Sequence, residues 1–525
     1  MNAIGSRVDA FDARYDYVIV GAGSAGCVVA RRLVERTDAT VLVLEAGPSD
    51  EGVPSIEDPT RWVENIGGAH DYAYRYEPNP SLDGRSMLLS RGKVLGGSGS
   101  INALVWARGH RDDFDGWAAD GNPGWDYESV LPLFRRSEDW EDGESEYRGS
   151  GGPMHIERAR NLHLVAQALI DAGLSLGMPY LDDIIVPQPE GTGPINTNVR
   201  HGSRVSPSAA FLRPLVGHDR LTILTGAEVT AVRLAGNRCT GIEAIIDGAI
   251  RTIAASEEVI LSAGAIDTPR LLMLSGIGPA ADLTRLGIRS VVDLPGVGHN
   301  LQEHPIIAGL CFEPERALGP LNNNLEGSIA FWHSNRALTV PDLAFVAVQI
   351  PYVSDEIAAT YPPPPNAFCI APGLMRVESR GYLKLRSATP SGPLEVQANM
   401  LAERADLDAI ADGIELGLEL ATQPAFRDLI HRWIAPTHQL TRNQILSFAR
   451  QACLPYFHPV GTCTMGTHEQ AVVDPELRVH GIAGLRIADA SIMPTITSAN
   501  TQAPTVMIAE HAADLITKSS DTADR

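Results

Sequence analysis

The sequence predicts an α/β fold in which a doubly wound, mostly parallel sheet is joined to an α+β part built on an antiparallel sheet. Residues 17–47 read as a β-branched run, a glycine cluster, a helical pattern and a second β-branched run, which is typical of one βαβ unit. Residues 306–454 contain strand-like runs such as GYLKLRS, followed by the long helical pattern DLDAIADGIELGLELA. The length of 525 residues exceeds that of a single compact core, so two or more domains are expected.

Composition excludes several function classes. The formal net charge of -22 would repel a phosphate backbone, so neither nucleic acid nor an anionic membrane surface is an expected partner. The six cysteines are scattered, without CxxC or zinc-ligand spacing, which favours reduced thiols, a cytoplasmic location and no metal site. The residues before Tyr17 lack the apolar core of a signal peptide, and no apolar run reaches the roughly 20 residues of a membrane span, so no membrane insertion is expected.

The βαβ unit carries a dinucleotide-binding pattern. Gly21, Gly23 and Gly26 occupy the three positions of G-x-G-x-x-G, where small residues allow a tight turn and close approach of a pyrophosphate to the backbone. Glu45 ends the second strand about 20 residues later, where a carboxylate accepts from ribose hydroxyls and repels an NADP phosphate. FAD and NAD both remain possible from this pattern, and a plain strand-to-helix turn is the alternative.

Three further segments carry a family resemblance. Residues 91–118 contain a glycine and serine loop with Gly96, Gly97, Ser98, Gly99, Ile101 and Asn102. Residues 264–279 read GAIDTPRLLMLSGIGP, and the C-terminal part contains YFHPVGTCTMG and SANTQAP. Together these segments resemble the signatures of the glucose-methanol-choline oxidoreductases. The resemblance implies FAD and a Rossmann-like FAD-binding domain.

The resemblance also assigns cofactor contacts. The diphosphate is expected near Gly21 to Gly26, the ribose on Glu45, the flavin ring near Asn102 and the adenine at the backbone of Val229. Family members with covalent flavin often have a histidine at the position of Ile101, which cannot form the bond, so non-covalent FAD is expected. The full set of predicted cofactor-binding residues is Gly21, Gly23, Ser24, Ala25, Gly26, Glu45, Ala46, Arg91, Gly96, Gly97, Ser98, Asn102, Ala103, Leu104, Val229, Ala263, Gly264, Asp489, Ala490, Asn500, Thr501 and Pro504.

Two side chains are the predicted catalytic residues. An alcohol releases hydride from carbon more easily as its hydroxyl proton is removed, so the site needs a base beside an electron acceptor. By resemblance His458, in HPVGT, is that base, with hydride passing to flavin N5, and Asn500 holds the alcohol oxygen. The alternatives are a buried structural histidine for His458 and a helix N-cap for Asn500. Tyr456 and Phe457 either line the substrate pocket, which would favour a flat or apolar alcohol, or pack in the core.

The three signatures lie far apart in the chain yet serve one cofactor, so the FAD-binding domain must be discontinuous. We predict that it comprises residues 1–155, 191–305 and 455–525. The substrate-binding domain then comprises residues 156–190 and 306–454.

The predicted reaction is the FAD-dependent oxidation of a small-molecule alcohol, expected to be primary, with aromatic or heteroaromatic alcohols as candidates. The electron acceptor is left open between O2, as in an oxidase, and a quinone or dye, as in a dehydrogenase. A flavin-dependent hydroxynitrile lyase, whose histidine only transfers protons, is an alternative class. A photodecarboxylase is a further alternative, although no feature of this acidic chain indicates a site for fatty-acid carboxylates.

Overall fold

The computed structural model describes the backbone of residues 14–523 and the side chains of residues 14–518. The prediction that no signal peptide precedes Tyr17 concerns mainly residues 1–13, which lie outside the described part. Among the helices of residues 14–523, none is long and apolar enough to cross a lipid bilayer.

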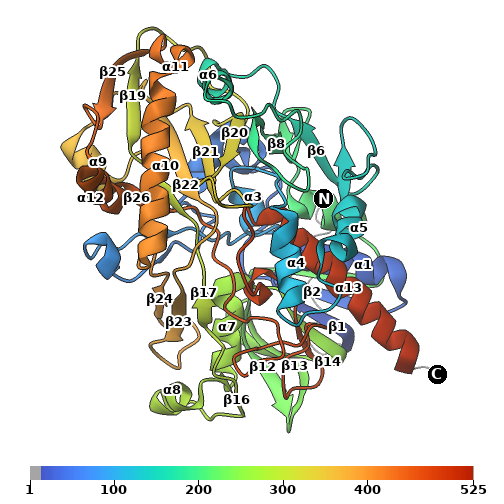
Figure 1. Cartoon of the computed structure of the whole chain (residues 1–525). Coiled ribbons are helices and arrows are strands. Elements are labelled where there is room, and N and C mark those ends of the chain that lie inside the picture. Colours follow the sequence, from blue (N-terminus) through green and yellow to red (C-terminus); the bar gives the residue numbers. More distant parts are fainter. Residues whose placement is uncertain (1–13, 524–525) are drawn as a thin grey trace.

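A seven-stranded sheet forms the lower part of the molecule in Figure 1, with the strand order β11–β2–β1–β14–β13–β12 and β27 beside β14. Strands β11, β2, β1, β14 and β27 run parallel to one another, and β13 is antiparallel to both β12 and β14. This arrangement confirms the predicted mostly parallel sheet. The strands are β1 (Arg14–Val20), β2 (Val41–Glu45), β11 (Leu221–Thr225), β12 (Ala227–Ala235), β13 (Arg238–Ile246), β14 (Ala249–Leu261) and β27 (Leu485–Ile487).

The first βαβ unit determines where ligands can approach this sheet. Strand β1 ends at Val20, and helix α1 (Ser24–Arg36) begins after a turn of three residues. Strand β2 is buried along its whole length, as expected for a parallel strand covered on both faces. The carboxyl ends of β1, β2 and β14 therefore lie at one edge of the sheet, which is where open α/β sheets bind ligands.

An eight-stranded antiparallel sheet forms the second part, in the order β25–β19–β22–β21–β20–β7, with β18 pairing with both β22 and β26. Helix α10 (Arg404–Thr422) packs against β22, and helix α6 (Leu164–Ser175) packs against β20 (Figure 1). This part confirms the predicted α+β architecture. The strands are β7 (Gly191–Pro194), β18 (Pro305–Ile307), β19 (Leu310–Pro314), β20 (Ser328–Trp332), β21 (Leu343–Val348), β22 (Phe368–Leu374), β25 (Ile430–Ala435) and β26 (Cys453–Pro455).

Smaller sheets and helices complete the fold. The GYLKLRS run forms β23 in a separate three-stranded sheet, β17–β23–β24, rather than in the eight-stranded one. The remaining strands are β3 (Tyr74–Arg75), β4 (Leu88–Leu89), β5 (Glu138–Trp140), β6 (Met154–Arg158), β8 (Asn196–Thr197), β9 (Val199–Arg200), β10 (Ser203–Arg204), β15 (Ile277–Gly278), β16 (Val292–Asp293), β17 (His299–Leu301), β23 (Gly381–Leu385) and β24 (Leu394–Gln397). The remaining α-helices are α2 (Pro54–Glu57), α3 (Ser98–Ile101), α4 (Arg111–Ala119), α5 (Tyr127–Ser137), α7 (Gly264–Leu274), α8 (Ala280–Arg285), α9 (Asp355–Thr360), α11 (Pro424–Arg427), α12 (Arg442–Ala452) and α13 (Gln502–Ala523).

The two large sheets bear on the predicted domain boundaries, which remain a proposal. Strand β7 falls in a segment that the predicted boundaries give to the FAD-binding domain, yet it pairs with β20 of the eight-stranded sheet. Strand β26 contains the predicted boundary at residue 455. The chain thus passes between the two parts several times.

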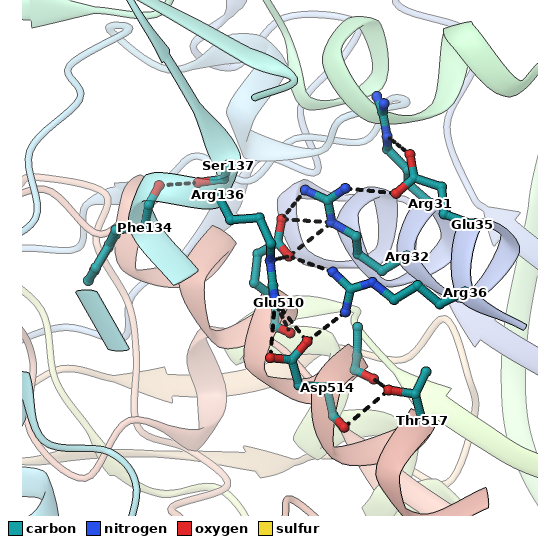
Figure 2. A network of polar contacts seen from close by, with 11 residues as sticks. Arg31, Arg32, Glu35, Arg36, Phe134, Arg136, Ser137, Glu510, Asp514 and Thr517 are labelled. Atoms are coloured by element: carbon teal, nitrogen blue, oxygen red, sulfur yellow. Dashed lines mark hydrogen bonds and ion pairs between the residues drawn. The ribbon is translucent and has the colours of Figure 1, made fainter. Parts of the chain in front are cut away.

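A cluster of arginines and carboxylates forms ion pairs that link helices α1, α5 and α13 (Figure 2). Glu510 on α13 is fully buried, and its carboxylate accepts hydrogen bonds from Arg32 of α1 at 2.7 to 3.0 Å and from Arg136 of α5 at 2.7 Å. Arg36 lies 3.7 Å from the same carboxylate and 2.6 Å from Asp514. One buried carboxylate therefore balances several guanidinium groups from two other helices.

We expect Glu510→Gln to lower the free energy of unfolding by about 3 to 5 kcal/mol, because removing one partner leaves buried charge without compensation. Urea unfolding of the FAD-loaded protein measures the change. Glu35→Gln is the matched control, since the Glu35 side chain is 32% exposed and also pairs with Arg32, and it should cost about 1 kcal/mol or less. Equal unfolding midpoints for the two variants would show that burial of the carboxylate is unimportant.

Candidate active site

A cavity opens at the carboxyl edge of the seven-stranded sheet, and we call it the sheet-edge cavity. Its walls include residues at the ends of β1, β2 and β14, together with the start of α1. Fifteen predicted cofactor residues line it: Gly21, Gly23, Ser24, Ala25, Glu45, Ala46, Arg91, Gly97, Ser98, Val229, Ala263, Gly264, Asp489, Ala490 and Thr501. Residues from widely separated parts of the chain are therefore brought to one site.

A second cavity adjoins the first, and we call it the histidine cavity. The two cavities share Arg91, Ser98, Thr501 and Gln502 in their walls. The predicted residues that line the histidine cavity, beyond the shared ones, are Asn102, Ala103, Tyr456, Phe457, His458 and Asn500. The predicted catalytic pair thus faces a space that meets the sheet-edge cavity.

Four predicted cofactor residues, Gly26, Gly96, Leu104 and Pro504, are not among the described residues that line either cavity. A Cβ atom on Gly26 would lie 2.0 Å from the Gly21 carbonyl oxygen, and one on Gly96 would lie 2.1 Å from Ser100 Oγ. These two glycines therefore permit close packing behind the walls. Leu104, with φ 63°, and Pro504 are buried.

The two glycine loops pack backbone against backbone. Gly97 has a φ of 56°, and a Cβ atom there would lie 2.7 Å from the Cα atom of Gly23. No side chain caps α1 at Gly23, so the first N–H groups of the helix are available to an anion in the sheet-edge cavity. This is the arrangement that a pyrophosphate requires.

We expect Gly97→Ala to weaken FAD binding by at least about 10-fold, because the left-handed backbone costs a non-glycine residue about 1 to 3 kcal/mol and the methyl group would push the two loops apart. The ratio of flavin to protein absorbance after gel filtration measures the loss. Gly116→Ala is the control, because a Cβ atom at Gly116, within α4, meets nothing within 4 Å. Full retention of flavin by Gly97→Ala would contradict this account of the loop contact.

Glu45 is held by backbone donors at the end of β2. Its Oε2 accepts from the Ala22 N–H at 3.1 Å, and its Oε1 accepts from the Gly47 N–H at 2.8 Å. Burial raises the pKa of Glu45 to about 7, although these two hydrogen bonds act in the opposite direction. The carboxylate is thus fixed in place at the wall, where ribose hydroxyls are expected.

Arg91 connects the two cavities. Its Nη1 donates to the Phe457 carbonyl oxygen at 2.8 Å, and its Nη2 donates to Ser98 Oγ. Burial lowers the pKa of Arg91. The guanidinium group is thus a partly buried cation that donates to two neutral acceptors at the junction of the cavities.

His458 has both ring nitrogens engaged. Its Nδ1 lies 3.0 Å from Nδ1 of His304, and its Nε2 lies 3.3 Å from the Asn500 side-chain nitrogen. The His458 backbone N–H donates to Glu303 Oε1 at 2.6 Å, and the Tyr76 hydroxyl donates to Glu303 Oε2 at 2.8 Å. Burial, with the neighbouring His304 and Arg91, lowers the pKa of His458 well below its usual range, so the ring is neutral at neutral pH.

Asn500 contacts His458 through its side chain, two residues before α13 begins at Gln502. The Thr501 carbonyl accepts the hydrogen bond from the Thr505 N–H that starts the helix. The contact between Asn500 and His458, which lie 42 residues apart in sequence, places the two predicted catalytic side chains together.

Aromatic side chains form much of the wall of the histidine cavity. Tyr456 and Phe457 both line it, as one of the two sequence interpretations expected, and the Tyr456 ring centroid lies 4.7 Å from that of His458. Phe457 has a left-handed backbone, with φ 62°, which is unusual for a large side chain. Trp62 and Tyr352 complete this wall.

Sequence reasoning missed several residues of the site. Gln502 lines both cavities and accepts from Ser24 Oγ at 2.9 Å, while its buried Nε2 atom has no hydrogen-bond partner. A buried donor without a partner at the junction fits a bound ligand with acceptor atoms. The other missed lining residues include Trp62, Tyr72, Asp267, Arg270, Glu326 and Tyr352. Three of them carried a signal: Gln502 lies two positions after Asn500 in SANTQAP, and Asp267 and Arg270 lie within GAIDTPRLLMLSGIGP.

Comparison with known proteins identifies the family. The model of the N-terminal domain of GMC oxidoreductases matches residues 15–306, and that of the C-terminal domain matches residues 377–509. The chain belongs to the GMC oxidoreductase family. It is 37% identical to the mitochondrial choline dehydrogenase of Mus musculus over 96% of this chain and 89% of that one, and 38% identical to the oxygen-dependent choline dehydrogenase of Vibrio vulnificus over 96% and 94%.

The solved structure of pyridoxine 4-oxidase from Mesorbium loti matches this GMC chain with a TM-score of 0.91 and 31% sequence identity, covering 95% of this chain and 98% of that one. The predicted fold class and enzyme class are confirmed: the chain is an FAD-dependent GMC oxidoreductase that acts on CH–OH donors. The residues of the sheet-edge cavity fit FAD through the uncapped start of α1 and the unpaired Gln502 amide.

Proposed function

We propose that this chain oxidises a primary alcohol to the aldehyde, with His458 as the base and with non-covalently bound FAD. The observation that carries the proposal is the contact between His458 Nε2 and the Asn500 amide in a cavity that adjoins the sheet-edge cavity. FAD, when bound, supplies the hydride acceptor. The predicted roles of the cofactor-binding residues are part of this proposal.

His458 and Asn500 have different proposed roles toward the alcohol. His458 is neutral at neutral pH, so its ring has a lone pair available for the hydroxyl proton of the alcohol. Asn500 can donate to the alcohol oxygen without taking its proton. Glu303 holds the backbone of His458, and Arg91 holds the carbonyl of Phe457, so the base is fixed from both sides.

The walls of the histidine cavity support an aromatic or heteroaromatic substrate. The rings of Trp62, Tyr352, Tyr456 and Phe457 suit a flat molecule. Burial raises the pKa of Glu326, in the same wall, to about 8, so its carboxyl group is largely protonated at neutral pH and can donate to a ring nitrogen. A pyridine alcohol combines these two features.

A panel of aryl, furan, pyridine, aliphatic, choline-like and polyol alcohols tests this function under anaerobic conditions. We expect the flavin to bleach fastest with a heteroaromatic or aryl alcohol. Peroxide formed in air, compared with dye reduction without air, distinguishes an oxidase from a dehydrogenase. If no alcohol bleaches the flavin, the proposed oxidation is excluded and the lyase becomes the better explanation. The relatives named above are two dehydrogenases and an oxidase, which favours oxidation.

Non-covalent attachment has its own test. Because Ile101 cannot bond to the flavin, we expect acid precipitation to leave all yellow colour in the supernatant and a white washed pellet. A yellow pellet would contradict non-covalent binding.

The cytoplasmic location remains a prediction.

A further inference from the structure

His304 joins the base to a backbone carbonyl group. It is fully buried, immediately before β18. Its Nε2 lies 3.0 Å from the Met375 carbonyl oxygen, and its Nδ1 lies 3.0 Å from Nδ1 of His458. The two rings are nearly perpendicular, at 88°. Nothing in the sequence pattern singles out His304, which follows the NLQE run.

These contacts assign every ring proton. A carbonyl oxygen only accepts, so Nε2 of His304 carries the proton. Burial lowers the pKa of His304 to about 3, so the ring is neutral and its Nδ1 has a lone pair. The proton between the two Nδ1 atoms therefore belongs to His458. The lone pair of His458 is left on Nε2, in the histidine cavity, where the Asn500 amide can donate to it.

The opposite assignment leaves two contacts unfavourable. If Nδ1 of His304 carried the proton, its Nε2 lone pair would face the Met375 carbonyl oxygen, and two acceptors would lie 3.0 Å apart. His458 would then have its proton on Nε2, facing the Asn500 amide nitrogen, so two donors would oppose each other. A histidine in that form could not accept a proton from an alcohol in the cavity.

We propose that His304 is a positioning residue that fixes His458 in the tautomer with the proton on Nδ1 and the basic lone pair on Nε2. This inference rests on the proposed role of His458 as the base. When Nε2 takes the alcohol proton, Nδ1 still donates to His304, whose lone pair stabilises the positive charge. His304 acts only through His458, so it should affect the rate of flavin reduction and leave alcohol binding largely unchanged.

Two measurements test the proposal. In nitrogen NMR of the FAD-loaded protein with labelled histidine, His458, assigned by comparison with His458→Ala, should show the proton on Nδ1. Stopped-flow flavin reduction should then be about 100 to 1,000 times slower in His304→Leu. It should stay within about 10-fold of wild type in His304→Asn, whose side-chain oxygen can accept from His458 Nδ1. The dissociation constant of the alcohol should change little in either variant.

A His458 ring protonated on Nε2 in the wild-type protein would overturn the proposal. This NMR test does not depend on whether His304→Leu folds. Unchanged flavin reduction in a folded His304→Leu protein would overturn it as well. These outcomes differ from failure of the proposed function, in which His458→Ala itself would reduce flavin at the normal rate.

Discussion

Flavin reduction by an alcohol should slow by about two to four orders of magnitude in His458→Ala, because a positioned general base contributes about that factor to the rate. Among the described residues that line the histidine cavity, His458 is the one histidine; His304 is fully buried behind it, and its Nδ1 faces His458. Anaerobic stopped flow, which follows bleaching of the flavin, measures the rate directly.

His438→Ala is the control for this substitution, because His438 is exposed and lies in the loop after β25, outside both cavity walls. It should reduce flavin at the wild-type rate. If His458→Ala binds FAD normally and bleaches within about threefold of wild type, the general-base effect is absent and His458 is not the base.

The second large effect is expected for Arg91→Met, which should lower the rate of flavin reduction by about 100-fold and weaken FAD binding. The substitution removes two charge-assisted hydrogen bonds, each worth about 1.5 to 3 kcal/mol. One of them holds the carbonyl of Phe457, whose left-handed backbone, with φ 62°, needs support from its surroundings. Loss of this hydrogen bond should let His458, the residue after Phe457, move out of position.

Arg75→Met provides the comparison for Arg91→Met. Arg75 also donates to a backbone carbonyl, that of Ser86 at 3.0 Å, but it is exposed and lines neither cavity. Flavin content and reduction rate should both be unaffected in this variant. Equal behaviour of the two arginine variants would show that the Arg91 cation has no special role.

Local sequence patterns were enough to predict the glycine turn and the carboxylate at the end of β2, which the structure places in the wall of the sheet-edge cavity. The glycines from Gly21 to Gly26 and the carboxylate of Glu45 follow from one βαβ unit, in which the order of the chain places the loop at the sheet edge. The family signatures then placed His458 and Asn500, which contact each other in the structure. These features depend on residues that are near in sequence or that belong to a recognisable motif.

The rest of the site depends on pairing between distant segments, for which a single sequence gives no signal. His304 meets His458 across 154 residues, and the carbonyl of Met375, the residue after β22, contacts the other ring nitrogen of His304. Trp62 reaches the cavity from a segment without a motif. Strand β7 pairs with β20, although about 130 residues separate them, so its place in the eight-stranded sheet could not be read from its four residues.

Chemical rescue tests the central claim, that the imidazole of His458 takes the alcohol proton, most directly. Imidazole added to FAD-loaded His458→Ala should restore flavin reduction in proportion to the concentration of neutral imidazole, so the rescued rate should rise with pH through the pKa of imidazole, near 7. A rescued rate that instead follows the imidazolium ion, or a rate of reduction that needs no added base at all, would contradict the claim.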